Sequence, residues 1–128
     1  MNEVIKVHVE DFYSIAAREG VPELVKIDVE GFETEVLNGM SQSLQSENLK
    51  AIIIELNGSG GRYGFDEKLI HDKLQKNGFQ PYQYDPFKRE LELLQHFGSH
   101  NTIYVKDIAF VKSRVEAADK VSIFSETF

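Results

Sequence analysis

Cysteine is absent from this 128-residue sequence. Its absence excludes disulfides, thiolate metal sites and cysteine nucleophiles. The sequence also lacks any apolar run near the ~20 residues that a membrane-spanning helix needs. The first residues, Met1 to Val4, show neither the basic nor the apolar region of a signal peptide. We therefore expect a cytoplasmic protein with no membrane partner.

Positive charge is in short supply as well. The sequence has 14 Lys and Arg residues against 21 Asp and Glu residues, which gives a net charge of -7. Its basic residues are scattered, whereas nucleic-acid-binding proteins normally concentrate positive charge in a patch. We therefore expect no nucleic-acid partner. A chain of this length suits one domain, which buries roughly two-thirds of the surface of the unfolded chain.

The hydrophobic pattern alternates between strand-like and helix-like segments. In chain order it predicts a strand over 4–9, a helix over 12–19, a strand over 24–28, a helix over 32–38, a strand over 51–56, a helix over 67–77, strands over 79–84 and 101–106, and a helix over 108–118. Such alternation is typical of an α/β fold with a mostly parallel sheet. The two late strands have no long helix between them, which predicts an antiparallel edge. We expect one domain over 1–118 and a tail over 119–128.

Acidic side chains follow the second and third predicted strands. Asp28 ends an apolar strand, Glu30 and Glu33 come directly after it, and Glu55 lies near the end of the next strand. In open α/β sheets, ligands bind just beyond the carboxyl ends of the strands. Acids placed there can orient a hydroxyl, accept its proton or bind a divalent cation. The alternative for Glu30 and Glu33 is a solvated position in the first turn of a helix, where the helix dipole favours negative charge.

A glycine-rich segment, Gly58 to Gly64, lies between a strand and a helix. This context is typical of a nucleotide-binding turn, and Asp85 follows at about the distance expected for a ribose-binding acid. The spacing is not G-x-G-x-x-G, however, so we favour a substrate loop with Arg62 and Tyr63 as contacts. An exposed loop without a ligand is the alternative.

Two further patterns do not support a catalytic site. His96 and His100 have the i, i+4 spacing of a helical metal site, but Gly98 between them argues against a helix. The serines lack the G-x-S-x-G turn of a hydrolase nucleophile. We therefore expect neither a metal site nor a serine hydrolase.

The run LVKIDVEGFE, from Leu24 to Glu33, is followed by VLNG at 36–39. Together they resemble the signature of the FkbM-type methyltransferases. Segments 9–12, 52–55 and 101–107 are also similar to that family, so the resemblance covers about residues 4–118.

The resemblance implies a Rossmann-like, S-adenosylmethionine-dependent O-methyltransferase that acts on a hydroxyl of a sugar or natural product. A small molecule or a glycan would then be the acceptor. By this resemblance, Asp28 and Glu30 lie near the methyl-transfer site, as catalytic and cofactor-binding residues. Glu55 is a further catalytic residue, and Asn57 binds substrate beside it.

The sequence departs from the family at its N-terminal end. Such enzymes open with a strand and a glycine-rich turn that binds the cofactor. Residues 1–23 of this sequence contain a single glycine, Gly20. The chain thus resembles the C-terminal part of the domain, without the cofactor-binding strands. We expect cofactor binding to need a complementing N-terminal segment, without which the chain is inactive. The alternative is a non-catalytic α/β module that assembles with a partner chain, or with itself, through an open sheet edge.

Overall fold

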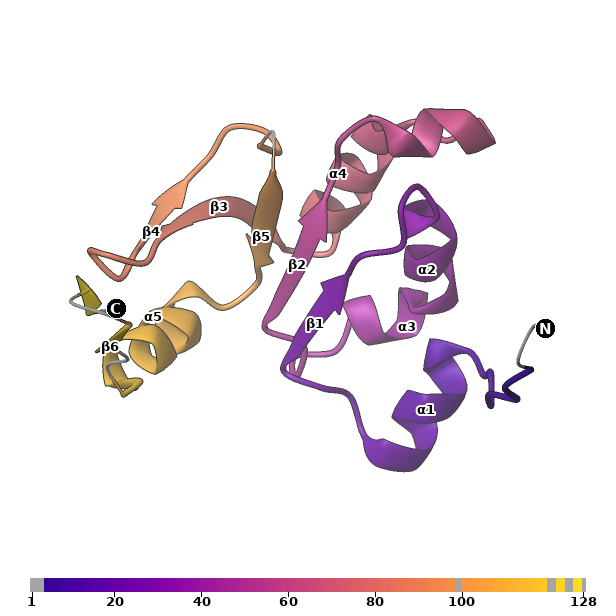
Figure 1. The fold of residues 1–128 in the computed structure, drawn as a ribbon, viewed down its shortest axis with the longest axis horizontal. Coiled ribbons are helices and arrows are strands. Elements are labelled where there is room, and N and C mark those ends of the chain that lie inside the picture. Colours follow the sequence, from indigo (N-terminus) through magenta and orange to yellow (C-terminus); the bar gives the residue numbers. More distant parts are fainter. Residues whose placement is uncertain (1–3, 99, 120–121, 124–125, 128) are drawn as a thin grey trace.

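A computed structural model describes residues 4–98, 100–119, 122–123 and 126–127 (Figure 1). The elements in chain order are α1 (Phe12–Glu19), β1 (Leu24–Ile27), α2 (Glu33–Gly39), α3 (Ser41–Leu44), β2 (Ala51–Glu55), the 3₁₀ helix η1 (Ser59–Tyr63), α4 (Glu67–Lys76), β3 (Gln80–Asp85), β4 (Glu90–Leu93), β5 (Asn101–Val105), α5 (Ile108–Ala117), β6 (Ser122–Ile123) and β7 (Glu126–Thr127). From residue 12 to residue 118, every predicted strand and helix is confirmed. None of the described helices is long and apolar enough to cross a membrane.

An aspartate caps the N-terminus of each of the three longest described helices, α1, α4 and α5. Asp11, Asp66 and Asp107 each accept a hydrogen bond from a backbone N–H two or three residues further along the chain. The first turn of a helix has N–H groups without a carbonyl partner, and a short carboxylate satisfies one of them. These helix starts are therefore determined locally by the sequence.

The sheet is mixed, with the strand order β1-β2-β5-β3-β4. Only β1 and β2 pair in parallel, while β5 lies between β2 and β3 and runs antiparallel to both. The prediction of a mostly parallel sheet with one antiparallel edge is therefore wrong. β1, β2 and β3 run in the same direction. β4 forms an antiparallel hairpin with β3, and β5 lies between β2 and β3. That insertion turns the central pairings antiparallel.

The prediction of a strand over 4–9 is also wrong. This segment has no regular secondary structure and makes no backbone hydrogen bond within the described part of the chain. Its apolar side chains are between 75% and 86% exposed. Figure 1 shows the segment on the far side of α1 from β1, so no strand lies beside it. Strand propensity alone does not form a strand, because the backbone groups need a partner.

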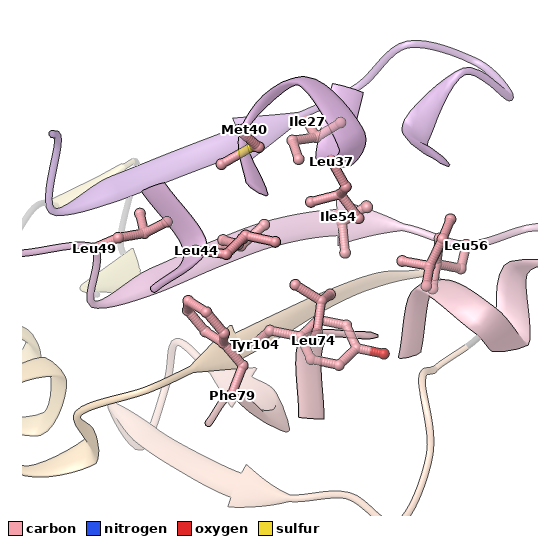
Figure 2. Packing of buried hydrophobic residues seen from close by; sticks show 12 residues of the cluster. Ile27, Leu37, Met40, Leu44, Leu49, Ile54, Leu56, Leu74, Phe79 and Tyr104 are labelled. Carbon is pink, nitrogen blue, oxygen red and sulfur yellow. The ribbon is translucent and has the colours of Figure 1, made fainter. Parts of the chain in front are cut away.

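The core lies between one face of the sheet and α2, α3 and α4 (Figure 2), and Phe12 of α1 is partly buried against it. Alternate side chains of the strands meet apolar side chains of the helices there. The buried members are Ile27, Leu37, Met40, Leu44, Leu49, Ile52, Ile54, Leu56, Ile70, Leu74, Phe79 and Tyr104. Helix α5 lies on the opposite face, where Leu24 and Ala51 line a cavity with Phe110 and Val111.

Residues 119–128, the predicted tail, include the pair β6 and β7. Whether the domain ends before them stays a prediction.

Candidate functional site

The parallel pairing of β1 with β2 determines where the candidate site lies. Ile27 pairs with Ile54 at the carboxyl ends of these strands. Asp28 and Glu55 each follow one residue later, so their backbones reach the same edge of the sheet. Asp28 is exposed and Glu55 is half-buried.

A tight turn follows Asp28. Glu30 has φ 52° and Gly31 has φ 112°, both in the left-handed region. Glu30 is exposed, as the alternative of a solvated position predicts, but it lies before α2 and not in the first turn of that helix. The turn aims this carboxylate at solvent, at the same sheet edge as Asp28.

Gly31 allows this turn to approach η1 closely. A Cβ atom at Gly31 would lie 2.7 Å from the backbone oxygen of Ser59 and 2.8 Å from the ring of Tyr63. Both distances are too short for any side chain. The glycine of the VEG sequence therefore lets the segment after β1 pack directly on the segment after β2.

Glu33 is buried, with 3% of its surface exposed. One of its carboxylate oxygens, Oε1, accepts a hydrogen bond of 3.3 Å from the backbone N–H of Gly31. The alternative of a solvated Glu33 at the helix start is therefore wrong. This carboxylate holds the turn that carries Glu30.

Glu67 makes the matching contact after β2, although no sequence pattern predicts this role. It is 8% exposed, and its Oε1 accepts a hydrogen bond from the backbone N–H of Gly58. An acid directly after the cap Asp66 is an ordinary helix-start pattern, so the sequence shows no signal of its burial.

Unpartnered oxygens gather around η1. Among the described residues, the buried side-chain polar atoms without a hydrogen-bond partner are Oε2 of Glu33, Oγ1 of Thr34, Oγ of Ser59 and Oε2 of Glu67. They come from the first residues of α2, η1 and α4. Buried polar atoms are normally hydrogen-bonded, so these oxygens are available to donors such as water or hydroxyls.

Aromatic side chains cover the same region. The rings of Phe32 and Tyr63 lie 4.2 Å apart between centroids, and Phe65 lies 6.3 Å from Phe32. Phe32 and Tyr63 stay 44% and 47% exposed. They form an accessible apolar surface beside the carboxylates.

The structure describes the side chain of only one of the two other predicted substrate-binding residues, Asn57 and Arg62. Asn57 is exposed, and its Oδ1 accepts a hydrogen bond of 3.0 Å from the backbone N–H of Ser59, which helps to form η1. The side chain of Arg62 lies outside the described part. The roles of these residues, and of Asp28, Glu30 and Glu55, stay predictions.

One apolar cavity of about 630 Å³ lies away from these acids. It is lined by Leu24 and Ala51, at the opposite ends of β1 and β2, and by Phe110 of α5. We place the candidate site at the carboxyl ends instead, because polar groups converge there and the cavity is mainly apolar.

Comparison with known protein families agrees with this geometry. The model of the Methyltransferase FkbM domain matches residues 2–81, which include β1, the turn at Gly31, β2 and η1. The chain belongs to the FkbM methyltransferase family. Methyltransferases of the FkbM family depend on S-adenosylmethionine. No curated protein and no solved structure matches the chain.

Proposed function

We propose that this FkbM chain provides the acceptor side of an S-adenosylmethionine-dependent O-methyltransferase site. The acceptor would be a hydroxyl of a sugar or natural product. The observation that carries the proposal is the parallel pairing of β1 and β2, which brings Asp28 and Glu30 to the same edge as Glu55 and Asn57. Membership of the family supports the same reaction.

The residues at this edge fit the charge of the implied cofactor. When bound, S-adenosylmethionine supplies a methyl group activated by a positively charged sulfonium. Asp28 and Glu30 are exposed carboxylates that would attract this positive charge. We therefore assign cofactor binding to these two side chains.

Glu55 is suited to the acceptor hydroxyl. It lies at the end of β2, opposite Asn101 of β5, and is half-buried. A carboxylate there would accept the proton that the hydroxyl loses as it is methylated. Asn57 would orient the acceptor through its amide group, and Tyr63 would contact its apolar surface.

Calorimetric titration with S-adenosylmethionine tests the proposal. Where the chain, alone or with a complementing segment, binds the cofactor, Asp28→Asn and Glu30→Gln should each weaken binding about tenfold, equivalent to ~1.4 kcal/mol. Glu92→Gln is the matched control, because Glu92 is an exposed acid on β4, the other edge strand. Equal binding by all of these variants would contradict the assignment. No heat at millimolar cofactor would show that the chain is not an active enzyme without a complementing segment.

A non-catalytic module that assembles with another chain is the second candidate function. One observation favours it. Among the described residues, β1 has a partner strand on one side only. An open strand edge is a ready template for pairing with another chain.

A further inference from the structure

A cavity of about 380 Å³, which we call the β3–β5 cavity, lies on the same face of the sheet as Glu55. Ile52 and Ile54 of β2 are completely buried against the helical layer. Successive side chains of a strand point to opposite faces, so Ile53 and Glu55 point away from those helices. Ile53 lines the cavity, and Glu55 follows ~7 Å further along the strand. The proposed proton acceptor is therefore next to this cavity.

The β3–β5 cavity forms where two neighbouring strands separate. The pairing of β3 with β5 ends at Tyr82 and Ile103, although β3 continues to Asp85. In Figure 1 the hairpin of β3 and β4 bends away from β5. Asn101, the first residue of β5, lines the cavity and pairs with Glu55. The cavity therefore lies at the edge that holds the carboxyl end of β2, where ligands bind in open α/β sheets.

Hydrogen bonds fix the wall of the cavity that follows β4. Leu94, Gly98 and His100 line this wall. The backbone N–H of Leu94 donates a hydrogen bond of 2.9 Å to the carbonyl oxygen of Pro81. The backbone N–H of Gly98 donates one of 2.8 Å to Oγ1 of Thr102, which is completely buried. The wall is therefore in place before a ligand arrives, as is usual for small-molecule sites.

The lining of the cavity combines apolar surface with uncharged polar groups. Isoleucine and leucine side chains supply the apolar part, and the ring of Tyr84 is 37% exposed beside them. Gln83 and Asn101 line the cavity and are exposed. An amide both donates and accepts hydrogen bonds, as a hydroxyl does. None of the described residues that line the cavity is an Asp, Glu, Lys or Arg.

We propose that the β3–β5 cavity binds the methyl acceptor and that this acceptor is a single neutral sugar ring. The assignment rests on the proposed function, which makes Glu55 the proton acceptor. A sugar ring offers hydroxyls to the two amides and an apolar C–H face to the Tyr84 ring. The volume is near the lower end of the ~300–1,000 Å³ of small-molecule sites, which suits one ring. A charged acceptor would lie there without an opposite charge, which is costly.

The cavity and the proposed catalytic acids lie in different parts of the chain. The FkbM domain model matches residues 2–81, which include Asp28, Glu30 and Glu55. Apart from Ile53, the described residues that line the cavity come after residue 81. The match to the family therefore does not determine the acceptor, and the lining of the cavity does.

Titration of the full chain with sugars, followed by NMR, tests the proposal. The probes are methyl pyranosides of gluco, galacto and manno configuration, added without cofactor. At least one should shift the backbone amide resonances of Gly98, Asn101 and Ile103, with a dissociation constant of ~1–10 mM. Gln83→Ala and Asn101→Ala should each weaken this binding about fivefold, because each removes a hydrogen-bonding amide. Gln80→Ala is the matched control, since Gln80 is exposed at the other end of β3 and should change nothing.

Three results would overturn the proposal. The first is that none of the three pyranosides shifts these resonances at ~100 mM, well above the expected dissociation constant. The second is equal binding by the wild-type chain, Gln83→Ala and Asn101→Ala. The third comes from two comparison probes, the aromatic catechol and the charged glucose 6-phosphate. Tighter binding of either one than of every pyranoside would assign the cavity to another class of acceptor.

The sugar titration and the cofactor titration fail separately, because the sugar is added without S-adenosylmethionine. Binding of a pyranoside without binding of the cofactor would leave the sugar site standing and count against the proposed reaction of this chain. Binding of the cofactor, weakened by Asp28→Asn, without binding of a pyranoside would support the proposed function and overturn the sugar site.

Discussion

Glu33 binds the backbone N–H of Gly31 through its buried carboxylate. Glu67 repeats this relationship with Gly58. Each glutamate is the first residue of its helix, and each glycine has a positive φ in the turn after a strand. Because β1 and β2 are parallel neighbours, the two contacts lie at one edge of the sheet. The shape of the candidate site therefore depends on two acids that are themselves buried.

Removing the Glu33 carboxylate should destabilise the fold. Glu33→Ala leaves the buried N–H of Gly31 without its acceptor, which costs ~1–3 kcal/mol. Glu35→Ala is the control, because Glu35 is exposed in the same helical turn and should change stability by less than ~0.5 kcal/mol. Urea unfolding measures both free energies. Equal effects of the two substitutions would contradict the buried contact.

Adding one carbon at Gly31 should be costly. Gly31→Ala would bring a Cβ atom to 2.7 Å from the Ser59 oxygen and would strain a residue with φ 112°. We expect a loss of ~1–3 kcal/mol. Gly39→Ala is the matched control with the opposite sign, because that helical position has nothing within 4 Å and alanine favours helices by ~0.5–1 kcal/mol. Thermal unfolding would show whether the two shifts differ in sign.

The contact between Phe32 and Tyr63 should be measurable as a coupling energy. Their rings lie 4.2 Å apart and join the turn after β1 to η1. A double-mutant cycle with Phe32→Ala and Tyr63→Ala should give a coupling of ~0.5–1.5 kcal/mol. Additive effects of the two substitutions would show that the rings do not interact in solution.

Stability should fall as the solution becomes acidic, because of a buried histidine. His71 is hydrogen-bonded through Nδ1 to the Tyr104 hydroxyl at 2.8 Å, and its ring lies 4.7 Å from that of His96. Burial, together with the charge of His96, lowers the pKa of His71 below its ordinary 6.5. The unfolded chain therefore binds a proton at a higher pH than the folded one.

Because the folded pKa of His71 is the lower one, protonation of His71 favours the unfolded chain. The contribution of His71 to stability is complete above pH 6.5 and is lost as the pH falls toward its lower folded pKa. His71→Gln should flatten this part of the profile of unfolding free energy against pH. An unchanged slope in this variant would assign the acid sensitivity to other groups.

Much of the secondary structure follows from local sequence. The strand Ala51–Glu55 is apolar up to its last residue, and Asp66 and Asp107 cap the helices α4 and α5. Such signals need only the residues next to them. The position of β5 between β2 and β3 has no local signal, because it depends on pairing with two strands that are distant in the sequence.

The candidate site, like the fold, could be predicted only in part from the sequence. That Asp28 and Glu55 end neighbouring strands could be predicted, because the pattern of apolar strands with a helix between them favours parallel pairing. The burial of Glu33 and Glu67 could not be predicted. It arises because Gly31 lets two turns far apart in the sequence come into contact.

The sequence by itself therefore determined the family, the starts of the aspartate-capped helices and the strand segments at 24–28, 51–56, 79–84 and 101–106. Each of these depends on residues close together along the chain. The tertiary structure alone decided the sheet order, the burial of the two glutamates and the unpaired state of residues 4–9. Each of these depends on whether a distant backbone lies alongside to accept hydrogen bonds and exclude water.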